Sequence, residues 1–182
     1  MTIKATQTPT KPQLVTTKPL DSFMFSYETF LAQEGSPLIL IADDDELMRT
    51  MLALVMEKEG YRVIEACNGE QCLAAYKVFR PDLVLLDAVM PGMDGFTCCR
   101  ELRAIANRQG TTILMITSLD DSESIQQAFT AGAMDYITKP IPWTLLRRRV
   151  RHLLQGSKLF QQFQQLNTEL KRRGTGSPTQ FV

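Results

Sequence analysis

Five polar or charged side chains stand at or just after the ends of short apolar runs in this sequence: Asp43, Asp44, Asp87, Thr117 and Lys139. Three are carboxylates, one is a hydroxyl and one is an ammonium. Two like unit charges about 4 Å apart repel by roughly 1 kcal/mol in water and about 4 kcal/mol at an effective dielectric of 20. Carboxylates gathered from separate runs therefore need a cation. Oxygen ligands without His or thiolate favour a hard ion, Mg²⁺ or Mn²⁺.

The next two acidic residues, Asp45 and Glu46, have a second explanation. They fall in the first turn of an expected helix, where the positive end of the helix dipole favours carboxylates. Helix capping explains Asp45 and Glu46 as well as cation binding does. It does not explain Asp43, Asp44 and Asp87 together.

The segments that must position these residues alternate between apolar runs and helical periods. Strands are expected at 38–42, 61–66, 82–87, 112–117 and 134–138. Helices are expected at 46–59, 68–79, 96–106, 121–131 and from Pro142 onward, with Asn68 as an N-cap and Gly132 as a stop. The first helix carries an apolar stripe of Leu47, Met51, Leu54 and Val55.

Apolar strands joined by helices are typical of a parallel sheet that is covered on both faces. Five such units are too few for an eight-fold barrel, which leaves an α/β fold with an open, doubly wound five-stranded sheet. In such sheets, ligands bind outside the carboxyl ends of the strands. We therefore expect the five polar side chains to meet at that edge.

Four motifs in this order and spacing resemble the receiver domain of two-component response regulators: ILIADDDELMR, DLVLLDAVMPGMDG, ILMITS and DYITKP. The resemblance covers roughly residues 37–155, and the DAVMPGMDG motif is the most specific part of it. It implies a flavodoxin-like sheet in the order 2-1-3-4-5, with helices on both faces.

The resemblance also implies roles for the acidic residues. Asp87 corresponds to the phosphoacceptor, while Asp43 and Asp44 correspond to the acidic pocket. Asp44 would bind Mg²⁺ directly and Asp43 would reach the ion through water. The backbone carbonyl of Val89 would be a further ligand.

The remaining motif residues receive roles in the same way. Lys139 would pair with a phosphoryl oxygen, next to a Lys139–Pro140 bond that can be cis. Thr117 would be the switch hydroxyl and Tyr136 the switch aromatic. From chemistry alone, Thr117 is explained equally well as a strand-end hydroxyl bonded to its own backbone, and Tyr136 as a half-buried strand residue.

The expected phosphodonor is a histidine kinase or a phosphotransfer protein. The chain would catalyse only its own phosphorylation and slow dephosphorylation, so we expect a signalling switch rather than an enzyme. Val89 and Leu119 stand two residues after Asp87 and Thr117, where receivers commonly flank the path of the hydrolytic water. Neither side chain can orient a water by hydrogen bonding, which predicts a long-lived phosphoryl group.

The composition limits the class of protein, the binding partners and the cell location that we expect for this switch. The net charge is zero, 44% of the residues are hydrophobic and 22% are charged, which excludes a wholly disordered chain and argues against electrostatic binding to nucleic acid or membrane. No run reaches the roughly 18 apolar residues of a membrane span, and no signal peptide is recognisable, so we expect a cytoplasmic protein. The four cysteines form no CxxC pair and His152 is distant, so buried reduced thiols are favoured over a zinc site.

We expect four regions along the chain. They are an N-terminal extension at 1–36, disordered or partly helical with a short amphipathic helix at 23–34, the receiver at 37–155, an amphipathic linker or dimerisation helix at 156–173, and a disordered tail at 174–182. Coiled-coil spacing relates Leu159, Phe163, Leu166 and Leu170. This seam either pairs with a second copy in a homodimer or folds back on its own domain. The basic run 147–151 is expected to be a solvated helix face rather than a nucleic-acid contact.

Two functional interpretations remain. In the first, phosphorylation controls a protein contact or dimerisation. In the alternative, the chain is the receiver and linker of a longer regulator with an attached output enzyme, such as a nucleotide cyclase. A haloacid-dehalogenase-like phosphatase would also use an Asp nucleophile, but the DxD pattern is missing because Ala88 and Val89 follow Asp87.

Overall fold

The computed structural model describes residues 35–106 and 111–174. The expected helix at 23–34 and most of the expected tail lie outside the described residues. Strands and helices alternate in the described part. In chain order they are β1 (Leu38–Ala42), α2 (Glu46–Lys58), β2 (Arg62–Ala66), α3 (Gly69–Phe79), β3 (Leu83–Asp87), α4 (Gly95–Ala106), β4 (Thr112–Thr117), α5 (Ser122–Ala131), β5 (Asp135–Thr138) and α6 (Trp143–Gly174).

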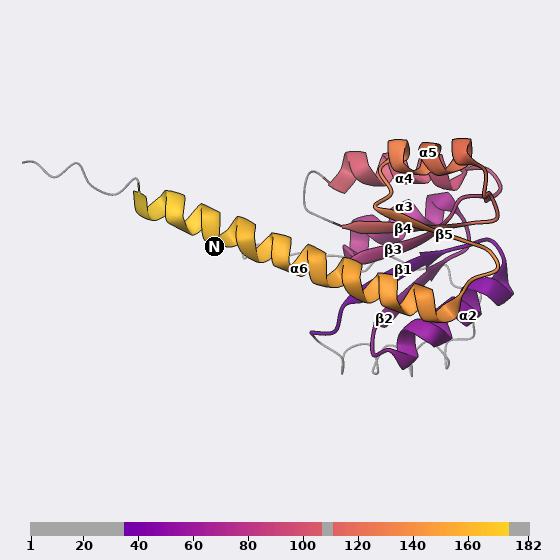
Figure 1. Cartoon of the computed structure of the whole chain (residues 1–182), viewed down its shortest axis with the longest axis horizontal. Helices are drawn as coiled ribbons and strands as arrows, with labels where there is room; N and C mark the ends of the chain where they lie inside the picture. The colour runs from indigo at the N-terminus through magenta and orange to yellow at the C-terminus, as the bar shows by residue number, and fades with distance from the viewer. Residues whose placement is uncertain (1–34, 107–110, 175–182) are drawn as a thin grey trace, which may run out of the picture. The chain divides into compact units, whose positions relative to one another are not determined.

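The five strands form one parallel sheet in the order β2-β1-β3-β4-β5, which confirms the expected topology. Helices cover both faces of the sheet (Figure 1). Side chains of α3, α4 and α5 pack against one face, and those of α2 and α6 pack against the other. The register pairs Ala42 with Leu86, Asp87 with Ile116, and Thr117 with Thr138. The polar residues at the carboxyl ends of these strands are therefore brought to one edge.

Local capping explains where several helices begin and end. The Asp45 carboxylate accepts hydrogen bonds from the backbone N–H groups of Leu47 and Met48, so this residue caps α2. Asn68 caps α3, as predicted. Gly132 ends α5 with a φ of 103°, a left-handed conformation that glycine adopts without strain.

The apolar face of α2 differs from the prediction. Leu47, Met51 and Leu54 are exposed, whereas the predicted Val55 is half-buried and packs on the core beside the buried residues Leu52, Ala53 and Met56. Because α2 is apolar around most of its circumference, its sequence offers two stripes with helical spacing. The stripe that packs on the sheet is the one that contains Leu52 and Met56.

The cysteines also differ in part from the prediction. Cys72, Cys98 and Cys99 are buried between α3, α4 and the sheet, as expected of reduced core thiols. Cys67 is exposed in the turn before α3, where its Sγ lies 3.1 Å from Oε1 of Gln71. The prediction of four buried thiols is therefore wrong for Cys67.

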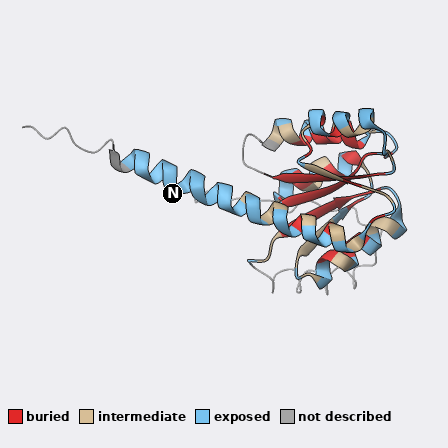
Figure 2. Cartoon of the chain, viewed as in Figure 1, coloured by how far each residue is buried: buried red, intermediate tan, exposed pale blue. Residues whose placement is uncertain are grey.

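Helix α6 is long and only its first half packs on the sheet (Figure 1). It begins at Trp143, one residue after the predicted start, and the carbonyl of Pro142 accepts the N–H groups of Leu145 and Leu146. The part beyond the sheet is solvent-exposed (Figure 2). All four seam residues are 59–66% exposed, so the seam does not fold back onto the described part of the domain: Leu159, Phe163, Leu166 and Leu170.

Among residues 35–106 and 111–174, no helix combines the length and apolar character needed to cross a bilayer.

Candidate functional site

Three carboxylates meet at the carboxyl edge of the sheet. Asp43 and Asp44 follow β1, and Asp87 ends β3, the neighbouring strand. One ligand oxygen from each lies within 4.8 Å of the others. Asp43 and Asp87 are only 1% and 5% exposed, while Asp44 is exposed. Three hard oxygen donors at this spacing, one of them open to solvent, suit a divalent cation such as Mg²⁺.

Lys139 reaches this cluster from the loop after β5. Its Nζ lies 2.8 Å from Oδ2 of Asp87 and 3.1 Å from Oδ2 of Asp43. Burial alone would lower the pKa of Lys139, but its hydrogen bonds and attraction to the two carboxylates raise the pKa above its ordinary value. Burial raises the pKa of Asp87, an effect that outweighs the hydrogen bond and charge of Lys139. Lys139 therefore stays charged and neutralises part of the cluster.

The loop after Asp87 makes a sharp turn, and its backbone passes close to the backbone of Asp87 and Ala88. Gly92 has a φ of 77°, and the Lys139–Pro140 peptide opposite is cis, as expected. A Cβ on Gly95 would overlap the carbonyl oxygen of Asp87 and lie 2.7 Å from Cα of Ala88, so no larger residue fits there without a shift. In this loop the backbone N–H of Val89 donates to Oδ1 of Asp87 at 3.2 Å.

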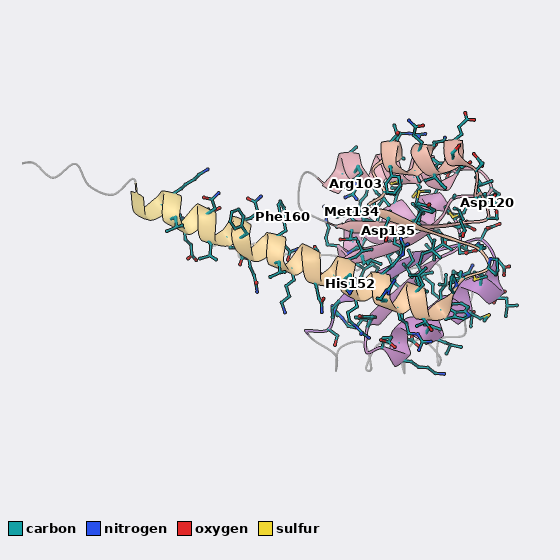
Figure 3. All side chains as sticks on the ribbon, in the orientation of Figure 1. Arg103, Asp120, Met134, Asp135, His152 and Phe160 are labelled. Atoms are coloured by element: carbon teal, nitrogen blue, oxygen red, sulfur yellow. The ribbon has the colours of Figure 1, made fainter. Side chains whose placement is uncertain are left out.

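Thr117 and Tyr136 lie on β4 and β5, next to the site but not in the carboxylate cluster. The Thr117 hydroxyl accepts a 2.9 Å hydrogen bond from the N–H of Leu119, which leaves its own hydrogen available to donate. Tyr136 is half-buried, and its ring contacts Phe129 edge-on with 5.7 Å between centroids. The loop after β4, marked by Asp120 in Figure 3, runs along the same edge.

The structure brings a further residue to this edge that the sequence analysis missed. Arg49 lies one turn into α2, donates a 2.8 Å hydrogen bond to the backbone carbonyl of Asp43, and pairs with Glu65 at 3.3 Å. Arg49 is the last residue of the ILIADDDELMR motif, but a charged residue within a helix is most simply explained as part of a solvated face, so the sequence analysis gave it no role.

The arrangement can do one kind of chemistry well. Asp87 is a buried carboxylate that faces two others and an ammonium, and a cation among them would bridge the acceptor and an incoming oxyanion. Thr117 and Lys139 can donate hydrogen bonds where negative charge develops. Such a site suits transfer of a phosphoryl group to a carboxylate.

Comparisons with known proteins agree with this chemistry. A family model described as the response regulator receiver domain matches residues 39–151. The chain is 35% identical over 119 residues to the transcriptional regulatory protein AfsQ1 of Streptomyces coelicolor, with coverage of 65% of this chain and 52% of that protein. It is 36% identical over 139 residues to the response regulator PleD of Caulobacter vibrioides, with coverage of 76% and 31%. The chain thus spans about half the length, or less, of these curated relatives.

Solved structures give the same result. The chemotaxis protein CheY4 of Vibrio cholerae is 28% identical with a TM-score of 0.62, over 65% of this chain and 99% of that one. The receiver domain of a Francisella response regulator is 27% identical with a TM-score of 0.63, over 67% and 99%. Receiver domains bind Mg²⁺ at an acidic pocket, and the carboxylate cluster of this chain stands at that place in the fold. The chain belongs to the response regulator receiver family of two-component systems.

Proposed function

We propose that the chain is a switch in which Asp87 accepts a phosphoryl group from a histidine kinase or a phosphotransfer protein. The observation that carries this assignment is the position of Asp87: buried at the end of β3, within 4.8 Å of Asp43 and Asp44, and 2.8 Å from Lys139. A carboxylate oxygen of Asp87 attacks phosphorus while the bond from phosphorus to the imidazole nitrogen of the donor breaks. The imidazole leaves with the bonding electron pair and takes up a proton.

The other residues of the site hold charge during this transfer. When Mg²⁺ is bound by Asp43, Asp44, Asp87 and the Val89 carbonyl, it supplies the positive charge that lets two anions meet. Asp44 would bind the ion directly, and Asp43 would reach it through water. These ligand assignments follow the family pattern and the spacing of the three carboxylates.

Two further groups contact the transferred phosphoryl in this proposal. Lys139, held at the cluster by its two ion pairs, exchanges a carboxylate partner for a phosphoryl oxygen. Thr117 donates its free hydroxyl hydrogen to another oxygen. Tyr136 follows Thr117 as the switch aromatic, and its half-buried ring contacts Phe129 edge-on.

The phosphoacceptor can be tested with a small phosphodonor and Mg²⁺. We expect one phosphoryl group on the wild type by intact mass and none on Asp87→Asn. Asp94→Asn is the matched control, because Asp94 is an exposed carboxylate whose role as acceptor for the N–H of Thr97 can be filled by Asn. A full adduct on Asp87→Asn would overturn the assignment, and so would loss of the adduct in Asp94→Asn alone.

The exposed apolar residues of α2 give the phosphodonor protein a surface to dock on. Leu47, Met51 and Leu54 are 70%, 39% and 52% exposed, on a helix that starts directly after the acidic residues. A partner that delivers a phosphoryl group to Asp87 has to approach this end of α2. We therefore propose that these three side chains contact the donor.

The output proposed here is a protein contact or dimerisation through α6. The seam residues Leu159, Phe163, Leu166 and Leu170 lie about 140° around the helix from Leu146, Val150 and Leu153, the residues that pack on the sheet. A continuous helix cannot present both faces to its own domain. Polar, uncharged residues occupy positions 161–162, 164–165 and 167–168 between the seam residues, and Glu169 is the one charged residue among them, so little like charge opposes the approach of two copies.

Light scattering tests this output. We expect beryllium fluoride with Mg²⁺ to raise the measured mass of the wild type, and Phe163→Glu to abolish that rise. Gln164→Glu is the control, because it adds the same charge away from the seam, about 100° around α6 from Phe163. A mass that stays monomeric in the wild type under both conditions at micromolar concentration would refute dimerisation through the seam.

A second candidate is the receiver and linker part of a longer regulator with an output domain, such as a nucleotide cyclase. The low coverage of the curated relatives favours it, since only 31% of PleD and 52% of AfsQ1 are matched. The length of the native reading frame separates the two candidates. For both, we propose a cytoplasmic location, which suits four unpaired cysteines, and no enzymatic activity of the receiver beyond its own phosphorylation and dephosphorylation.

A further inference from the structure

Arg49 connects three elements at the edge of the sheet that carries the carboxylates. Its Nη1 donates a 2.8 Å hydrogen bond to the backbone carbonyl of Asp43, which directly follows β1. Its Nε lies 3.3 Å from Oε2 of Glu65, on the neighbouring strand β2. The Arg49 side chain is only 13% exposed, so the residues around it restrict it to a conformation that makes both contacts at once.

The bond to Asp43 matters because of the peptide that it fixes. The carbonyl of Asp43 and the N–H of Asp44 belong to one rigid peptide plane, which also contains the Cα of Asp44, the atom that carries its side chain. Asp43 has its own restraints, since its carboxylate accepts hydrogen bonds from Lys139 and from the N–H of Asp45. Asp44 is exposed, and its carboxylate has no hydrogen bond to any described residue. Its direction therefore depends on the backbone.

We infer that Arg49 is a positioning residue: its guanidinium fixes the Asp43–Asp44 peptide so that the Asp44 carboxylate stays directed at the cation site. This inference rests on the proposed function, in which Asp44 is a direct Mg²⁺ ligand. Groups behind metal ligands that hold them in place typically change metal affinity by about 10–100-fold when they are lost.

The charge of Arg49 and its hydrogen bond to the Asp43 carbonyl should change the affinity for Mg²⁺ in opposite directions. A guanidinium next to a cation site repels the cation, although Glu65 offsets part of this charge. If Arg49 mattered only through its charge, removing it would tighten Mg²⁺ binding. If it matters by holding the peptide, removing it weakens Mg²⁺ binding despite the lost repulsion. The two roles therefore predict shifts of opposite sign.

Isothermal titration with Mg²⁺, without any phosphodonor, distinguishes them. We expect Arg49→Met and Arg49→Lys each to raise the Mg²⁺ dissociation constant about tenfold, because Lys keeps the charge but cannot make both contacts. Arg148→Met is the matched control on an exposed face of α6 and should bind as the wild type does. Circular dichroism confirms that each variant is folded, and if Arg49→Met fails to fold, Arg49→Lys decides the question.

Three results would overturn the inference: tighter binding by Arg49→Met, unchanged binding by either Arg49 variant, or an equal loss in Arg148→Met. Failure of the proposed function looks different. In that case, the wild type itself would bind no Mg²⁺, and Asp44→Asn would leave the titration unchanged.

Discussion

Replacement of Lys139 by Met should destabilise the metal-free protein more than the metal-bound protein. Lys139 is the shared counter-ion of Asp43 and Asp87, with Nζ at 3.1 Å and 2.8 Å from their oxygens. Without it, carboxylates within 4.8 Å of one another face each other unscreened. At that separation, two unit charges repel by about 3 kcal/mol at an effective dielectric of 20 and by about 1 kcal/mol in water. We expect the free energy of unfolding to fall by about 1–3 kcal/mol in EDTA at pH 7.

Urea denaturation in EDTA and in excess Mg²⁺ measures this difference. The loss should shrink in Mg²⁺, because the cation replaces the ammonium as the counter-charge. Binding to the native state also adds stability, by an amount that grows with the logarithm of the free Mg²⁺ concentration. Lys77→Met is the control, since Lys77 lies exposed on α3, away from the carboxylates. An equal loss with and without Mg²⁺ would refute the reasoning and leave only a packing role for Lys139.

The pH dependence of this loss has a definite sign. Burial already raises the pKa of Asp87 in the wild type, and removal of the ammonium raises it further. A carboxyl whose pKa is higher in the folded than in the unfolded state favours folding more as the pH falls through the folded pKa. The deficit of Lys139→Met should therefore shrink on acidification, as Asp87 becomes neutral and the repulsion disappears.

Three further outcomes follow from the described contacts. Gly95→Ala should lower the free energy of unfolding by about 1–3 kcal/mol in urea, because its Cβ would overlap the Asp87 carbonyl, and an unchanged midpoint would contradict that contact. The phosphorylated wild type should lose its phosphate more slowly than the Val89→Asn, Leu119→Glu double variant in a mass-based decay assay, and equal decay would refute the shielding by these two side chains. A thiol reagent should label one cysteine, Cys67, in the native protein and all four in urea, whereas rapid labelling of more than one native thiol would contradict the buried positions of the others.

Much of the fold could be predicted because strand and helix signals agreed with tertiary packing. The runs 38–42 and 112–117 are almost wholly apolar and form β1 and β4 with the predicted bounds. These patterns do not determine the order of the strands, because an apolar strand carries no information about its neighbour in a parallel sheet. That order could be expected only from the resemblance to receiver domains.

Predictions failed where one sequence allowed two arrangements. Helix α2 has two apolar stripes, and only its packing on the sheet, not its periodicity, shows which one is buried. Cys67 is exposed because it lies in a turn, a position that residue type alone does not reveal.

In the candidate site, too, some residues could be predicted from the sequence and one could not. The strand-end rule brought Asp43, Asp44, Asp87 and Lys139 to one edge correctly, as their distances show. Arg49 was missed because, besides its ion pair with Glu65, its contact at the site is with a backbone carbonyl, and a carbonyl is present at every position of the chain. Only the folded structure reveals which carbonyl a side chain meets.

The length of helix α6 determines how far a small tilt would move its exposed end. It runs without a break from Trp143 to Gly174, so at 1.5 Å per residue it is about 48 Å long. Its first residue lies only four positions after Lys139, and the far part carries Phe160 and the seam well beyond the sheet (Figure 3). For a rod of this length, a tilt of about 5° at the base moves the tip by about 4 Å. Because the helix is unbroken, a small rotation of the half that packs on the sheet would displace the exposed half by about the size of a side chain.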